Sequence, residues 1–239
     1  MQCGYNSDEI YELFKRYCDK IKYIDFKNIG KILWGLITRR ELVIDGLNSG
    51  EVIEKIVRQA AKDKGIYNIN EIKMPLIIPS VDLNTGKLYM FSSMKKRSYS
   101  DEIIYINDID IAKAVRASCS YPGIFSPCKY KNIELIDGGI RENIPWKEAK
   151  ANGAKKVLCV RFESEGRIKK NKNIIDILSS SLSILKHELY NYEIEGADYV
   201  LNLKTMKMSL LDCSKIDYLY RLGYEQTNKY LKIYKVYII

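Results

Sequence analysis

The sequence is poor in the residues that build the commonest catalytic and metal-binding sites. It has one histidine in 239 residues, His187, which excludes a histidine-rich metal site. A Ser-His-Asp triad would have to use that one residue. Because leucines recur at helical spacing around it, we expect His187 on the surface of a helix. Hydrolytic chemistry is therefore expected to use a carboxylate alone, and no metal or other cofactor is predicted.

Closely spaced cysteine pairs are absent. The six cysteines form no C-x-x-C motif, and their spacing fits neither a zinc site nor the disulfide framework of a small secreted domain. We expect them to be buried free thiols in a reducing compartment. Cys119 follows Ser118 directly, but no candidate base stands near it in the sequence, so we do not expect it to be a nucleophile. The six are Cys3, Cys18, Cys119, Cys128, Cys159 and Cys213.

Long hydrophobic runs are also missing. No stretch approaches the roughly 18 uncharged apolar residues of a membrane span, although 46% of the residues are hydrophobic, enough for a sizeable core. The N-terminus has neither the basic nor the apolar region of a signal peptide. We therefore predict a cytoplasmic protein with a single domain over residues 1–239.

Positive charge is in excess, with a formal net charge of +9. The densest basic runs are Lys95–Arg97 and Arg167–Lys172, and no nucleic-acid-binding motif accompanies them. A basic nucleic-acid binder is an alternative that rests on charge alone, and we expect no nucleic-acid partner. The surplus favours peripheral contact with an anionic membrane surface. The oligomeric state cannot be read from the sequence.

The most informative segment that is present is Ile133–Gly139. A short apolar run, typical of a strand, ends in Asp137 and is followed by Gly138 and Gly139. Glycine permits positive φ and the close approach of other groups, so we expect Asp137 at the lip of a cleft. An Asp-Gly pair between apolar runs is also a strong hairpin signal. Here Asn143–Pro145 follows, which favours a helix start and hence a site at the carboxyl end of a strand.

Strand and helix patterns alternate along the chain. This alternation predicts an α/β fold, a three-layer sandwich with a mainly parallel central sheet. A hairpin is expected at 75–91, where polar turn residues separate two apolar runs. Further strands are expected at 133–137, 155–162 and 199–203, and helices at 8–17, 51–57, 110–117, 146–150, 173–196 and 215–234.

Taken in order, several segments resemble the patatin-like phospholipases, a family of serine acyl hydrolases. The family uses a Ser-Asp dyad without histidine, in keeping with the scarcity of histidine here. The resemblance implies that Asp137 is the catalytic aspartate and proton acceptor, and that Gly138 and Gly139 form its supporting loop. The segments that carry it span nearly the whole chain: Pro75–Asp82, Asn84–Gly86, Val115–Pro127, Ile136–Gly139 with Asn143 and Pro145, Asn152–Val157, Ser209–Asp212 and Leu222–Glu225.

The other catalytic parts of that family are not found. Its nucleophile lies in a G-x-S-x-G elbow and its oxyanion donors in an earlier glycine-rich loop, so no nucleophile is predicted in this chain. The segment Gly46–Gly50 places Ser49 one position too late and is better explained as a helix start. We therefore expect a patatin-like fold that lacks its N-terminal strands. Met1 is then an internal methionine of a longer protein, or the gene is broken.

The resemblance implies a lipid acyl hydrolase of the phospholipase A type, which releases fatty acids from a lipid or ester substrate through an acyl-enzyme. We expect this chain alone to be inactive, because the serine and the oxyanion loop are absent. We also expect it to be poorly soluble without a partner fragment, because missing strands leave strand edges and apolar faces exposed. The alternative is a non-catalytic lipid- or acyl-binding remnant, a pseudoenzyme of the same fold.

Overall fold

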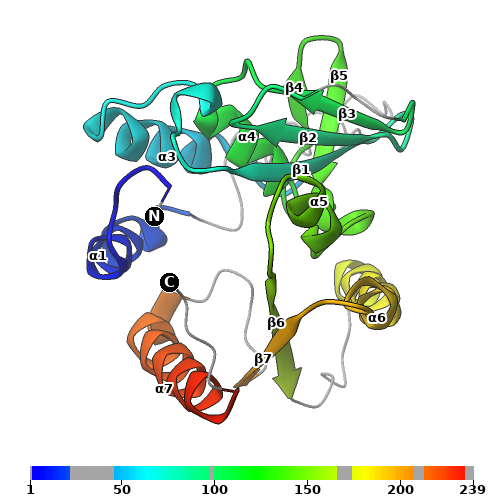
Figure 1. Ribbon diagram of the computed structural model, residues 1–239. Coiled ribbons are helices and arrows are strands. Elements are labelled where there is room, and N and C mark those ends of the chain that lie inside the picture. Colours follow the sequence, from blue (N-terminus) through cyan, green and yellow to red (C-terminus); the bar gives the residue numbers. More distant parts are fainter. Residues whose placement is uncertain (1, 22–45, 97–99, 166–173, 207–212, 235–239) are drawn as a thin grey trace. The chain divides into compact units, whose positions relative to one another are not determined.

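The computed structural model describes residues 2–21, 46–96, 100–165, 174–206 and 213–234 (Figure 1). The chain divides into two compact units. The first comprises Met1–Ile10 and Asp19–Asn143, and the second comprises Tyr11–Cys18 and Ile144–Ile239. The predicted features at Arg167–Lys172 and Ser209–Asp212 lie outside the described residues. The prediction of a single domain stays a prediction.

The first unit is built on a mixed sheet of five strands in the order β3-β2-β1-β5-β4 (Figure 1). Strand β1 lies in the middle and pairs antiparallel with β2 on one side and with β5 on the other. Strand β4 is antiparallel to β5, and β3 is parallel to β2. The strands are β1 (Ile77–Asp82), β2 (Leu88–Ser92), β3 (Ile103–Ile106), β4 (Cys128–Tyr130) and β5 (Ile133–Asp137).

The prediction of a mainly parallel sheet is wrong for this unit, because three of its four strand pairings are antiparallel. Short turns are the reason for two of the three, β1 with β2 and β4 with β5, since a parallel pairing needs a long crossover connection. Asp82 stabilises the turn between β1 and β2 by accepting hydrogen bonds from the Asn84 N–H at 3.3 Å and the Thr85 hydroxyl at 2.5 Å. Lys131, with φ 51°, forms the turn between β4 and β5. The predicted hairpin at 75–91 is confirmed.

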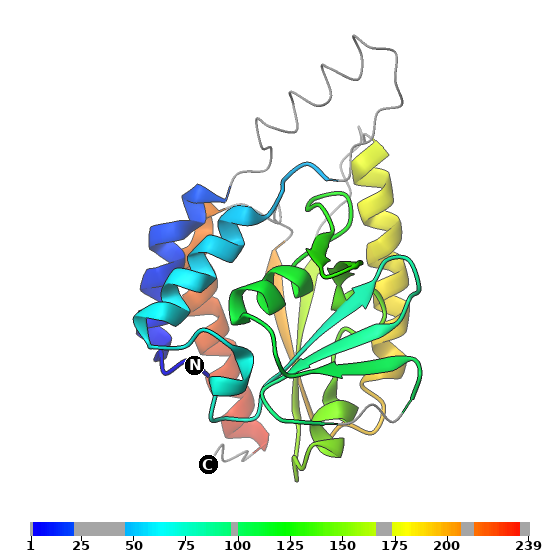
Figure 2. The same ribbon diagram turned by 90° about the horizontal axis from the view of Figure 1, so that it is seen from above.

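Each face of this sheet carries its own apolar cluster, as the alternation of side chains along a strand requires. On one face, Phe91 and Leu135 are fully buried against Ala114 and Ala117 of α4 (Ile111–Ser118). Helix α3 (Glu51–Asp63) packs in turn on α4 (Figure 2). The other face carries a smaller cluster of Val81, Leu88, Met90 and Ile136. Strand β5 therefore contributes to both cores.

Helices α3 and α4 lie where the sequence predicts them, with different starts. Asp110 caps α4 by accepting a hydrogen bond from the Lys113 N–H at 3.0 Å. At α3 the cap is Gly50 in the left-handed region, with φ 67°, and no side chain caps it. The side chain of Asn48 instead stabilises the turn that precedes the helix. Its Oδ1 accepts a hydrogen bond from the Gly50 N–H at 2.6 Å. The segment around Ser49 is thus a helix start, as predicted.

The second unit contains a strand-helix-strand motif. Strands β6 and β7 are parallel and in register from Leu158↔Tyr199 to Glu165↔Met206, with α6 connecting them (Figure 1). This part confirms the expected alternation, and a parallel pair joined by a helix is the usual βαβ unit. The side chain of His187, in α6, lies outside the described residues. The elements are α5 (Trp146–Ala151), β6 (Leu158–Glu165), α6 (Ile174–Glu193), β7 (Tyr199–Met206) and α7 (Ile216–Tyr234), and most of α1 (Ser7–Tyr17) belongs here too.

The fold is therefore mixed α/β with a central sheet of five strands. The three-layer arrangement and the missing N-terminal strands stay predictions. Over the described ranges, no helix combines the length and the apolar content that a membrane span needs.

The prediction that all six cysteines are free is wrong. Cys18 and Cys213 form a disulfide, with their Cα atoms 5.9 Å apart. The sequence could not reveal the pair, because 195 positions separate its members. Cys128 and Cys159 are buried thiols as expected, whereas Cys119 is exposed.

Candidate functional site

Backbone pairing fixes the position of Asp137 at the end of β5. Asp137 is the Cα partner of Ser80 in the antiparallel pairing with β1. Its N–H donates to the carbonyl oxygen of Ser120 at 3.1 Å, which ties the strand end to the loop after α4. The hydroxyl of Ser80 donates to the Ile136 carbonyl oxygen at 2.7 Å. The candidate aspartate is thus held by β1 and by the loop after α4 at once.

The side chain of Asp137 begins a 3-10 helix that covers Gly138–Ile140. Its Oδ1 accepts a hydrogen bond from the Gly139 N–H at 2.7 Å. A carboxylate that accepts an N–H in this way is oriented by the backbone. Asp137 is half-buried, so its side chain reaches the protein surface. The loop of Gly138 and Gly139 thus orients the carboxylate through one backbone hydrogen bond.

Gly138 is required by close packing. Neither it nor Gly139 is among the described glycines with positive φ, so that part of the sequence argument is wrong. A Cβ at Gly138 would lie 2.5 Å from the carbonyl oxygen of Pro79 and 2.6 Å from its carbonyl carbon. Both atoms belong to the backbone of β1. They therefore cannot move aside as the end of a flexible side chain could. Glycine therefore lets β5 and β1 approach at the point where Asp137 emerges.

We expect Gly138→Ala to lower the free energy of unfolding by about 2 kcal/mol, because the added methyl group overpacks a backbone contact. The matched control is Gly223→Ala in α7, where an added Cβ meets nothing within 4 Å. That change should raise stability by roughly 0.5–1 kcal/mol, the difference in helix propensity. Urea denaturation of both variants measures the two effects. Equal stability of Gly138→Ala and wild type would contradict the assigned contact.

Cys119 lies close enough to Asp137 to sense its charge. Partial desolvation of the thiol and, second, the negative charge of Asp137 raise the pKa of Cys119 above its ordinary value. The nucleophilic form of cysteine is the thiolate. A raised pKa therefore disfavours Cys119 as a nucleophile, in agreement with the sequence argument.

This proximity is measurable in the chain as it stands. We expect Asp137→Asn to move the pH midpoint of Cys119 alkylation by iodoacetamide to lower pH, because removal of a neighbouring negative charge favours the thiolate. Peptide mass spectrometry distinguishes Cys119 from the other thiols. The matched control is Glu134→Gln on the same strand, which should leave the midpoint unchanged. An unchanged midpoint in Asp137→Asn would show that the two side chains are not neighbours.

The two serines joined to the Asp137 backbone are unsuited to act as its nucleophile. Ser80 and Ser120 are both 0% exposed. The Ser80 hydroxyl donates to Ile136, and the Ser120 hydroxyl donates to the carbonyl oxygen of Arg116 at 2.9 Å. Each proton that a base would remove is therefore already used in a buried hydrogen bond. A nucleophilic serine is not found among these neighbours.

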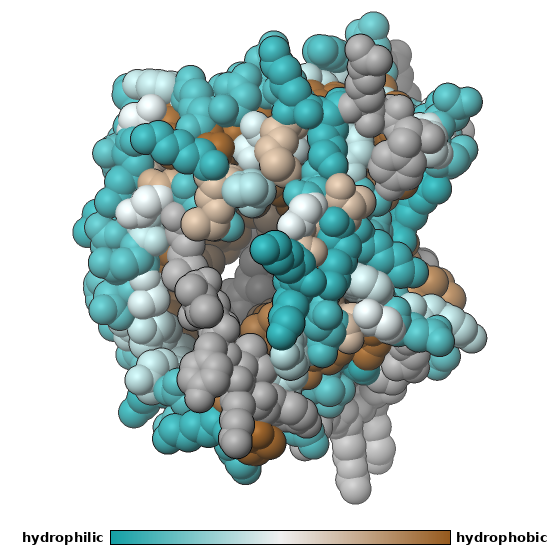
Figure 3. Space-filling model, in the orientation of Figure 1, coloured by the Kyte–Doolittle hydropathy of each residue, from teal (hydrophilic) through white to brown (hydrophobic). Residues whose placement is uncertain are grey.

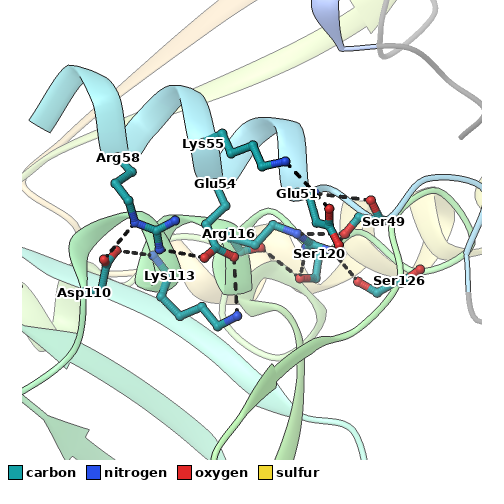
Figure 4. Close-up of polar contacts among 10 residues, drawn as sticks. All are labelled: Ser49, Glu51, Glu54, Lys55, Arg58, Asp110, Lys113, Arg116, Ser120 and Ser126. Carbon is teal, nitrogen blue, oxygen red and sulfur yellow. Dashed lines mark hydrogen bonds and ion pairs between the residues drawn. The ribbon is translucent and has the colours of Figure 1, made fainter.

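Arg116 organises the loops beside the site, as Figure 4 shows. It is 3% exposed, and burial lowers the pKa of its guanidinium. Nη2 donates to the carbonyl oxygen of Ser126 at 2.7 Å, and Nε to that of Ser49 at 3.2 Å. Nη1 donates to the Ser120 hydroxyl at 2.5 Å. One side chain thus connects the start of α3 with the loop whose Ser120 holds Asp137.

A set of ion pairs next to this network joins α3 to α4 (Figure 4). Arg58 pairs with Glu54 at 2.7 Å and with Asp110 at 3.0 Å, and Lys113 lies 3.4 Å from Glu54. The Arg58 side chain is 44% exposed, so these pairs contribute little to stability. We assign them to helix packing, because these ion pairs join residues of α3 to one another and to the first turn of α4. Among the described residues, no cluster of His, Cys, Asp and Glu could hold a metal ion.

The chain belongs to the patatin-like phospholipase family, whose model matches residues 2–150. The match contains the whole first unit from Gln2 onward and the predicted site residues Asp137, Gly138 and Gly139. An uncharacterized protein of Bacillus subtilis, YqhO, is 29% identical over 181 residues. The alignment covers 72% of this chain and 59% of that relative, so the chain spans somewhat less than two thirds of the length of YqhO.

Proposed function

We propose that this chain carries the proton-accepting half of a lipid acyl hydrolase, with Asp137 as the general base. Membership of the family supports hydrolysis of lipid esters in general. The observation that carries the finer proposal is the half-buried Asp137 carboxylate at the end of β5, oriented by the Gly139 N–H. Lipid or another ester is the substrate, and contact with an anionic membrane surface brings the basic chain to it.

The reaction needs a serine that these residues do not supply. Asp137 accepts the proton of the serine hydroxyl while the oxygen attacks the ester carbonyl. The tetrahedral intermediate expels the alcohol, which takes up that proton, and an acyl-enzyme remains. Water then gives its proton to Asp137 and attacks the acyl carbon, so that the fatty acid leaves and the serine is restored. Backbone N–H groups would stabilise the oxyanion, at about 3 kcal/mol for each donor.

We propose that the serine and the oxyanion donors belong to a segment that precedes Met1 in a longer protein. The lack of a G-x-S-x-G motif and the buried, fully used hydroxyls of Ser80 and Ser120 support this proposal. The cysteine beside Asp137 does not replace the serine, because its pKa is raised. On this proposal the 239-residue chain has no acyl hydrolase activity of its own.

The second unit exposes a set of large apolar side chains. This exposure supports the proposal that the complete protein has a further segment. Phe162 on β6 is 66% exposed, and on α6 Ile184 and Leu185 are 64% and 61% exposed. Hydrophobic groups gather around β6, β7 and α6 on the visible face (Figure 3). Parallel strands are normally covered on both faces. We call Phe162, Ile184 and Leu185 the apolar surface of the second unit.

We expect this apolar surface to make the purified chain self-associate, because large exposed apolar groups promote aggregation. Replacing Phe162, Ile184 and Leu185 by lysine should increase the monomer fraction several-fold in size-exclusion chromatography with light scattering. Met74→Lys in the first unit is the matched control, since Met74 is 56% exposed but lies outside the apolar surface. A wild-type chain that is monomeric and unfolds in one sharp thermal transition would contradict this expectation.

The competing proposal is a non-catalytic lipid- or acyl-binding remnant of the same fold. Translation of the DNA upstream of the Met1 codon separates the two. An in-frame G-x-S-x-G a dozen or so residues earlier supports the enzyme, and the extended protein should then hydrolyse p-nitrophenyl esters. A stop codon with no such motif supports the remnant, and fatty-acid binding by the 239-residue chain becomes the assay.

A further inference from the structure

Helices α1 and α7 meet in the second unit through surface contacts. The rings of Tyr11 and Tyr220 lie 4.5 Å apart. The hydroxyl of Tyr11 donates to Oδ1 of Asp217 at 2.5 Å, and Lys15 Nζ lies 3.3 Å from the same oxygen. Figure 2 shows α1 in blue beside the orange start of α7. The end of one helix thus contacts the beginning of the other.

These contacts, and the exposed ion pair of Glu9 in the first turn of α1 with Lys64 at 3.1 Å, hold α1 weakly. The side chains of Lys15 and Asp217 are 44% and 60% exposed, and exposed ion pairs contribute little to stability. No residue of α1 is buried, and the helix has 11 residues. A helix of this length is marginal in water unless packing supports it. Something stronger than the polar contacts is needed to keep α1 on α7.

The disulfide provides that connection. Cys18 follows the last residue of α1, and Cys213 lies three residues before α7 begins at Ile216. The bond therefore joins the two helices at the ends where Tyr11 and Lys15 meet Asp217. It also closes a loop of 195 positions. In the chain-entropy model, the stabilisation that a disulfide provides increases with the length of the loop it closes. Both cysteines are half-buried, so a small thiol reagent has access to them.

We propose that Cys18 and Cys213 form a redox-dependent clamp that fastens α1 to α7. A low-molecular-weight disulfide of the glutathione class is the oxidant. The Cys18 thiolate attacks one of its sulfurs and expels a thiolate; the Cys213 thiolate then attacks the Cys18 sulfur and expels the second. Two protein thiols and one small disulfide become one protein disulfide and two small thiols. A dithiol reductant reverses the exchange and frees α1. The proposal does not depend on the acyl hydrolase function.

The first test is the disulfide itself. After equilibration with oxidised glutathione, the denatured chain should show four free thiols, Cys3, Cys119, Cys128 and Cys159. A non-reducing digest should contain the Cys18 peptide joined to the Cys213 peptide, and a reductant should separate them. Six free thiols, or a different pair of linked peptides, would overturn the proposal.

The second test is local release of α1. Amide hydrogen exchange in α1 should become about tenfold faster or more on reduction, because the helix then opens on its own. Exchange in α4 should change much less than exchange in α1. Cys18→Ser and Cys213→Ser should behave like the reduced wild type and should no longer respond to reductant. Cys3→Ser, a half-buried free thiol near the same end of the chain, is the matched control and should respond like wild type.

Thermal unfolding gives an independent readout. Loss of a native disulfide from a chain of this size should lower Tm by roughly 5–15 °C. The same decrease should appear on reduction of wild type and in each of the two serine variants. If amide exchange in α1 is equal in the oxidised and the reduced protein, the disulfide forms but does not hold α1 on α7. That result would overturn the clamp even if the peptides are linked.

Discussion

Arg116→Ala should lower the free energy of unfolding by about 3 kcal/mol, because it leaves buried acceptors without their donor. The guanidinium donates hydrogen bonds to the carbonyl oxygens of Ser49 and Ser126 and to the hydroxyl of Ser120. Arg116→Lys should lose most of the same stability, since a single ammonium group lacks the planar fork that reaches three acceptors. Chemical denaturation of both variants measures the loss.

The matched control is Arg58→Ala in the neighbouring ion pairs of Figure 4. Arg58 also bonds to two partners, but it is exposed, so its loss should cost less than about 1 kcal/mol. A similar small effect for Arg116→Ala would contradict the network. Because the positive charge of Arg116 favours the Cys119 thiolate, loss of Arg116 should also move the Cys119 alkylation midpoint to higher pH, whereas loss of Arg58 should not.

The second large effect concerns catalysis. In a protein extended upstream to include a G-x-S-x-G segment, Asp137→Asn should reduce kcat/KM for ester hydrolysis by about a thousandfold, within the range of general-base contributions. Asparagine keeps the hydrogen bond from Gly139 through its amide oxygen but does not accept the serine proton. The fold should therefore survive, which circular dichroism checks.

Glu134→Gln is the matched control for this loss. It removes one carboxylate from β5, and its side chain lies 4.0 Å from Lys129 on β4, with 41% exposure. Its hydrolysis rate should equal that of the parent. A hydrolysis rate in Asp137→Asn within tenfold of the parent would remove Asp137 from the mechanism.

Much of the local structure could be predicted from sequence because periodicity and turn chemistry are local signals. The hairpin of β1 and β2, the strand that ends at Asp137 and the β6-α6-β7 unit all lie where expected. Strands β3 and β4 were not predicted, since they have four and three residues and alternation cannot be recognised over so few. The antiparallel pairing of β1 with β5 could not be predicted either, because the two strands are far apart in the sequence.

The surroundings of the site were less accessible to sequence reasoning. A basic residue inside a helix normally indicates a solvated face, so Arg116 could not be recognised as buried. The sequence indicates that Gly138 is important, but positive φ is not the reason. The reason is its contact with Pro79, which lies on a strand more than 50 residues away in the sequence. The disulfide between Cys18 and Cys213 likewise depends on tertiary structure alone.

The most direct test of the central claim is one ester-hydrolysis assay on four proteins. They are the 239-residue chain and its upstream-extended form, each with and without Asp137→Asn. We predict turnover by the extended parent alone, because only there do a nucleophilic serine and the Asp137 carboxylate occur together. Turnover by the 239-residue chain, or undiminished turnover by the extended Asp137→Asn protein, would contradict it.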